Sequence, residues 1–78
     1  MSVSAYVLIQ TDVGKAAEVT RQVRTISGVV AAEDVTGPYD VIAQIESASM
    51  DDLGRMVVSQ IQRIDGITRT VTCPVVNL

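Results

Sequence analysis

Two kinds of apolar spacing divide this 78-residue chain into six elements. Four segments alternate apolar and polar residues with the two-residue period of a β-strand, and two repeat apolar residues every three or four positions, as amphipathic helices do. In chain order, these patterns predict a strand at residues 3–10, a helix at 14–26, strands at 29–36 and 39–46, a helix at 50–64 and a strand at 67–73.

Each predicted helix has one apolar stripe, and its ends carry polar residues or glycine. Thr11 or Asp12 is expected to cap the first helix with a side-chain oxygen, and Ser49 to cap the second. Gly28 can adopt the left-handed conformation that ends a helix. Gly54 costs about 1 kcal/mol relative to Ala inside a helix, so we expect it to mark a close approach to the sheet. The stripes are Ala16, Val19, Val23 and Ile26 in the first helix, and Leu53, Val57, Ile61 and Ile64 in the second.

The second half of the chain repeats the first. Gly66 follows Gly28 by 38 residues, and the same offset matches the pairs Val19 and Val57, Gln22 and Gln60, Val23 and Ile61, Ile26 and Ile64, and Val29 and Ile67. Two such strand–helix–strand units, joined by a hairpin, predict the ferredoxin-like βαββαβ fold of the α+β class. Its four-stranded antiparallel sheet carries both helices on one face.

The other face of the predicted sheet has no covering element. It should carry Ser4, Tyr6, Leu8, Ile42, Ala32 and Thr70, or the alternate residues of those strands. Hydrophobic residues make up 47% of a chain that lacks Phe and Trp, so the apolar surface is aliphatic and spread over the strands. Because a domain this small has a thin core, we expect two such faces to pack together as a dimeric α/β barrel.

Charge and composition exclude several function classes. A net charge of −3 with six scattered basic residues argues against direct nucleic-acid binding, which needs clustered Lys and Arg. No apolar run approaches the roughly 18 residues that span a bilayer, and the first residues lack a signal-peptide pattern. We therefore expect a soluble, cytoplasmic protein of one domain over residues 1–78, without a membrane partner.

The residues offer little for catalysis or for a cofactor. Histidine is absent, the single cysteine cannot form an internal disulfide, and no glycine-rich phosphate loop or metal-ligand spacing occurs. Cys73 is expected to be a small buried hydrophobic residue. Glu33 and Asp34 are neighbours on a strand and point to opposite faces, so at least one must lie at an edge, in a wet cavity or in a pair. These features predict a protein that is not an enzyme and holds neither a metal nor a cofactor.

The turn between the two repeats, residues 35–40, is the best candidate for ligand contact. A free amino acid has a carboxylate that needs N–H donors and an ammonium that needs an acceptor. Gly37 offers the first through its backbone, and Asp40 offers the second. The simpler interpretation stays open: Gly37 and Pro38 make a turn, Tyr39 packs its ring, and Asp40 bonds nearby amides.

The run Val35-Thr36-Gly37-Pro38-Tyr39-Asp40, followed by residues 41–45, resembles the hallmark of the C-terminal effector domain of the Lrp/AsnC family, also called the RAM domain. The steps at residues 26–29 and 64–67, and the run Thr68-Arg69-Thr70-Val71-Thr72, are similar to the family pattern as well. The resemblance covers essentially the whole chain.

This resemblance implies a sensor of a small effector. Family members dimerise through their sheets, the dimers assemble into tetramers, octamers or larger rings, and effector amino acids bind between dimers. Carried over by position, Gly37, Tyr39 and Asp40 would touch the ligand. Val35 and Thr36 would form the pocket wall, and Thr70 and Thr72 would line the pocket from a neighbouring segment.

Typical family members carry an N-terminal helix-turn-helix domain, whereas this sequence starts at the effector domain. We therefore expect a stand-alone module that does not bind DNA itself and acts through a full-length Lrp/AsnC regulator or by buffering an effector. Two alternatives stay open. The first is a small dimeric α/β-barrel enzyme similar to the antibiotic-biosynthesis monooxygenases, and the second is a structural oligomerisation partner.

Overall fold

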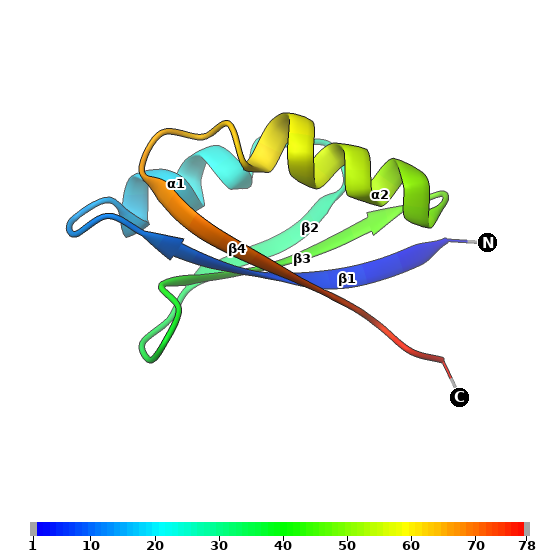
Figure 1. Ribbon diagram of the computed structural model, residues 1–78, viewed down its shortest axis with the longest axis horizontal. Coiled ribbons are helices and arrows are strands. Elements are labelled where there is room, and N and C mark those ends of the chain that lie inside the picture. Colours follow the sequence, from blue (N-terminus) through cyan, green and yellow to red (C-terminus); the bar gives the residue numbers. More distant parts are fainter. Residues whose placement is uncertain (1, 78) are drawn as a thin grey trace.

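The computed structural model describes residues 2–77 and confirms the ferredoxin-like βαββαβ fold (Figure 1). All neighbouring strands are antiparallel, in the order β2-β3-β1-β4, and both helices cover one face of the sheet. The elements are β1 (Val3–Thr11), α1 (Ala16–Val23), β2 (Val29–Asp34), β3 (Val41–Ser47), α2 (Met50–Met56), the π-helical turn η1 (Val57–Ile61) and β4 (Ile67–Pro74).

The core lies between the helices and the sheet and is entirely aliphatic. The predicted stripes face it: their central members are buried, while Ala16, Ile26 and Ile64 pack at its margin. The two central strands contribute every second residue, as their alternation predicts. The buried set is Ala5, Val7, Ile9, Val19, Val23, Ala32, Val41, Ala43, Ile45, Leu53, Val57 and Ile61.

The opposite face of the sheet is open in the single chain. Tyr6 is 43% exposed, and Leu8, Ile42 and Val71 are half-buried on the same face. Leu8 pairs with Ile42 on β3 and with Val71 on β4. Ala32 and Thr70 do not belong to this face, because each follows an irregularity in its strand pairing. A bulge adds one residue and therefore reverses the side on which later residues lie.

Cys73 was expected to be buried, and this prediction is wrong for the single chain. The residue is exposed on the outer strand β4, directly across from Tyr6 on the open face. Its small apolar side chain therefore adds to the uncovered surface and not to the core.

The first helix begins two residues later than predicted, and neither Thr11 nor Asp12 caps it. Thr11 continues β1, and Gly14 turns the chain with a φ of +80° before Lys15 takes the N-cap position without a side-chain bond. At the second helix the prediction is confirmed, because the Ser49 hydroxyl accepts the Asp52 N–H at 3.1 Å.

The second helix does not stay α-helical to its end. After Met56 the chain forms the π-turn η1, and the Gln62 N–H donates to the Val57 carbonyl at 2.9 Å, five residues earlier. A π-turn holds one residue more than an α-turn and recurs at functional sites. It changes the direction in which Gln62 points.

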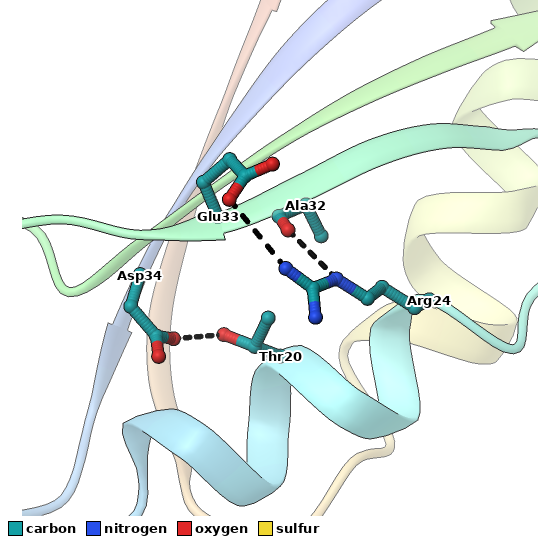
Figure 2. A network of polar contacts seen from close by, with 5 residues as sticks. All are labelled: Thr20, Arg24, Ala32, Glu33 and Asp34. Carbon is teal, nitrogen blue, oxygen red and sulfur yellow. Dashed lines mark hydrogen bonds and ion pairs between the residues drawn. The ribbon is translucent and has the colours of Figure 1, made fainter.

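Polar side chains from the α1 region cover the free edge of β2 (Figure 2). The Arg24 Nε donates to the Ala32 carbonyl at 2.9 Å, and its guanidinium contacts Glu33 at 3.5 Å. The Thr20 hydroxyl bonds the Asp34 carboxylate. Both neighbouring acids thus lie on an edge strand with a partner, as predicted. A covered edge resists pairing with another strand.

Two glycines with opposite surroundings give a stability test of this packing. Gly28 has a φ of +98°, which is strained for any residue with a side chain, and a Cβ there would lie only 3.0 Å from the Glu46 carbonyl oxygen. Gly54 was expected to approach the sheet closely, but it is exposed in α2 with nothing within 4 Å of such a Cβ. Gly28→Ala should therefore lower the free energy of unfolding by more than about 1 kcal/mol, and Gly54→Ala should raise it by about 0.5–1 kcal/mol.

Urea unfolding at one fixed protein concentration measures both variants, since assembly would otherwise change the apparent stability. A destabilising Gly54→Ala would mean that this glycine is packed closely in the assembled protein.

Candidate functional site

The turn at residues 35–40 leaves the sheet at one end and bends away from the helices (Figure 1). Two backbone hydrogen bonds fix its base: the Val35 N–H donates to the Asp40 carbonyl at 2.9 Å, and the Asp40 N–H donates to the Ile9 carbonyl at 2.9 Å. The turn is therefore anchored both to itself and to the central strand β1. Its tip projects from a rigid base, which is how binding groups are commonly presented.

The Asp40 side chain strengthens this anchor. Its Oδ2 accepts the Thr11 N–H at 2.8 Å and lies 3.3 Å from the Thr11 hydroxyl. The carboxylate thus ties the start of β3 to the end of β1, which is the structural role that the sequence also allowed. Both contacts use Oδ2, so Oδ1 remains for another partner.

The tip of the turn presents free backbone donors. Within residues 2–77, the N–H groups of Thr36, Gly37 and Tyr39 make no hydrogen bond. Gly37 has a φ of +124° and is exposed, with nothing within 4 Å of the position a Cβ would occupy. Successive uncommitted amides in a turn can form a concave site for an anion.

Thr70 and Thr72 lie elsewhere in the single chain. They pair with Ile9 and Val7 across β4 and β1 and are half-buried on the helix side of the sheet. Because β1 separates β4 from β3, Thr70 lies about 10 Å from the start of β3, two strand spacings away. The chain therefore does not bring these threonines together with the Gly37–Asp40 segment.

Two pockets lie near these predicted residues. One, of about 290 Å³ on the open face, includes the predicted Val35; its lining is Tyr6, Ala31, Glu33, Val35, Ile42 and Gln44. The other, of about 260 Å³ on the helix side, includes the predicted Thr70; its lining is Gln62, Ile67, Thr68, Arg69 and Thr70. The sequence pattern placed Tyr6 and Ile42 on the open face, but it did not indicate Gln62 or Arg69.

The described part of the chain, residues 2–77, has no group of three or more Cys, Asp or Glu side chains arranged to hold a metal ion. None of its helices is long and apolar enough to cross a bilayer.

A family model described as the Lrp/AsnC ligand binding domain matches residues 4–77. The chain is also 29% identical over 75 residues to an uncharacterised HTH-type transcriptional regulator from Pyrococcus furiosus. That match covers 92% of this chain and 50% of the relative. The chain thus spans about half the length of the curated relatives it matches.

Solved structures share the whole architecture. The crystal structure of FFRP-DM1 matches with a TM-score of 0.90 and 30% identity, over 95% of this chain and 99% of that one. A transcriptional regulator from Neisseria meningitidis, NMB0573, solved as its L-Met complex, matches with a TM-score of 0.85 over 96% of this chain and 50% of that one. At 18% identity, the second match concerns the fold alone.

The Asp40 anchor predicts a graded loss of stability. Asp40→Ala removes the acceptor of the part-buried Thr11 N–H and should lower the free energy of unfolding by about 1–3 kcal/mol. Asp40→Asn keeps a side-chain oxygen at that place and should therefore lower the free energy of unfolding by a smaller amount. Urea unfolding compares the two variants, with Asp65→Ala as an exposed loop control. Equal losses for Ala and Asn at residue 40 would contradict the anchoring role of the oxygen.

Proposed function

The chain belongs to the family of Lrp/AsnC ligand binding domains, and we propose that it senses a free amino acid and regulates transcription through the assembly it forms. In this proposal residues 1–78 act as one ligand-binding domain without enzymatic activity. The ligand-contacting residues are Gly37, Tyr39 and Asp40, with Val35 and Thr36 as the wall.

The observation that carries the proposal is the pairing of free donors with a fixed carboxylate in one short turn. The N–H groups of Thr36, Gly37 and Tyr39 have no partner within residues 2–77, and Asp40 keeps Oδ1 uncommitted. Such donors suit the carboxylate of an amino acid, and Oδ1 suits its ammonium group. Because three hydrogen bonds hold the base of the turn, little further ordering is required on binding.

Relatives support the regulatory part of the proposal. The matched Pyrococcus protein is an HTH-type transcriptional regulator, and the Neisseria regulator was solved with L-Met. For this chain, a net charge of −3 suits a protein that influences DNA through a partner, such as a full-length Lrp/AsnC regulator, and not by direct phosphate contacts.

Assembly completes the proposed site. The open face, with its half-buried Leu8, Ile42 and Val71, would pack against a second copy as a dimeric α/β barrel. Thr70 and Thr72 would reach the Gly37–Asp40 turn of another subunit, since they are separated from their own turn by β1. Ligand binding and association of dimers would then depend on each other.

The test is a thermal-shift screen against the twenty amino acids, followed by calorimetric titration of those that stabilise the protein. At least one should raise the melting temperature in a concentration-dependent manner. Asp40→Asn keeps the Thr11 contact but removes the negative charge, so it should weaken binding by about tenfold or more. Asp65→Asn makes the same charge change in the exposed loop before β4, outside the turn at residues 35–40, and should bind as the wild type does.

The proposal fails if no amino acid stabilises the protein, or if Asp40→Asn and Asp65→Asn bind equally well. Light-scattering mass with and without the stabilising amino acid then reports the assembly. A ligand that binds without any effect on mass would separate sensing from association.

A further inference from the structure

Three polar residues form a row across one end of the open face of the sheet. Gln10 follows the buried Ile9 on β1 and pairs with Arg69 on β4, so both side chains lie on the open face. Asp40 lies beside Gln10 on the other side, because its N–H bonds the Ile9 carbonyl and its carboxylate accepts the Thr11 N–H. This polar row therefore consists of Asp40, Gln10 and Arg69, and it runs from the start of β3 across β1 to β4.

The turn at residues 35–40 lies on the same side of the sheet as the polar row. It leaves the sheet at this end and bends away from the helices, which cover the opposite face (Figure 1). Val35 lines the pocket on the open face, and its N–H bonds the Asp40 carbonyl. The uncommitted amides of the turn and the polar row thus border one end of the open face.

The polar row has a carboxylate at one end and a guanidinium at the other. The backbones of Asp40 and Arg69 are about 10 Å apart, because β1 lies between them and each step is one strand spacing. Within residues 2–77, Arg69 forms no ion pair. Glu33 is also an acid of the open face, but it lies on β2, three strand spacings from β4. The Arg69 guanidinium is therefore available to an anion.

We infer that the sensed amino acid is an acidic one and that Arg69 binds its side-chain carboxylate, an assignment that rests on the proposed function. In that function the turn amides hold the α-carboxylate and Asp40 holds the ammonium group. A ligand held in this way can extend its side chain along the polar row, over Gln10 and towards Arg69. The planar guanidinium can bond both oxygens of the second carboxylate, and the Gln10 amide can donate to the same group.

The surroundings of the polar row favour a charged ligand side chain over an apolar one. Gln10 and Arg69 are both exposed, so an apolar side chain would bury little surface there. A carboxylate would gain a charge-assisted, bidentate pair instead. Because the ligand and the Arg69 side chain must together cover the distance from Asp40, glutamate should fit better than aspartate, which is one methylene shorter.

The test compares L-glutamate with L-glutamine, which has nearly the same shape but no side-chain charge. Calorimetric titration at constant ionic strength should show that the wild type binds glutamate about tenfold more tightly. In Arg69→Gln this preference should disappear, because the cation is lost. Arg63→Gln removes the same charge from an exposed residue after η1, outside the polar row, and should keep the tenfold preference.

Three results would overturn the inference while the proposed amino-acid function stands. The wild type could bind glutamine as tightly as glutamate, Arg69→Gln could keep the preference, or Arg63→Gln could lose it equally, which would indicate attraction by net charge alone. If no amino acid binds at all, the proposed function and the inference both fail. Because Arg69 is exposed, its replacement should leave the fold intact, and thermal unfolding of each variant checks this.

Discussion

The register between β1 and β3 is the constraint on which the rest of the structure depends. It places Ala5, Val7 and Ile9 beside Ile45, Ala43 and Val41, so that all six face the helices. A slip of one residue would turn every one of these side chains to the open face. Asp40 fixes this register at one end through Thr11, and the pairing of β1 with β3 continues to Val3 and Ser47 at the other end.

The candidate site follows from the same constraint. Because Asp40 holds the end of β1, the turn before it starts from a fixed point. Within residues 2–77, the N–H groups of Thr36, Gly37 and Tyr39 at its tip make no hydrogen bond. One carboxylate thus serves the fold through Oδ2 and remains open to a ligand through Oδ1. The open face is a second feature: both helices cover one side of the sheet, and in the single chain Leu8, Ile42 and Val71 lie half-buried on the other side.

The fold could be predicted from the sequence because its determinants are periodic. The 38-residue repeat and the helix stripes depend only on spacing, and Gly28 and Gly66 share a φ of +98° at equivalent positions. The errors arise where one residue is added or a conformation changes. Bulges in β2 and β4 reversed the sides of Ala32 and Thr70, and Gly14 started a turn where a helix was expected. Helical spacing cannot reveal a π-turn, because one extra residue leaves the apolar pattern nearly intact.

The site was predictable only in part. Turn chemistry identified residues 35–40, but the contact of Asp40 with Thr11 spans 29 positions and has no local sequence signal. The pocket beside Thr70 was missed for the same reason, since the 3.0 Å hydrogen bond from Gln62 to Thr70 forms only after the π-turn and the bulge have set the directions of these two segments. Gln62 and Thr70 have no distinguishing signal in the sequence, and the π-turn and the bulge bring them together.

The central claim is that the free amides of the turn bind the carboxylate of an amino acid. The most direct measurement is the ¹⁵N–¹H spectrum of the labelled protein with and without each of the twenty amino acids. We expect saturable shifts of the Thr36, Gly37 and Tyr39 amides with at least one of them. Saturable shifts confined to other regions, with these three amides unchanged, would contradict it.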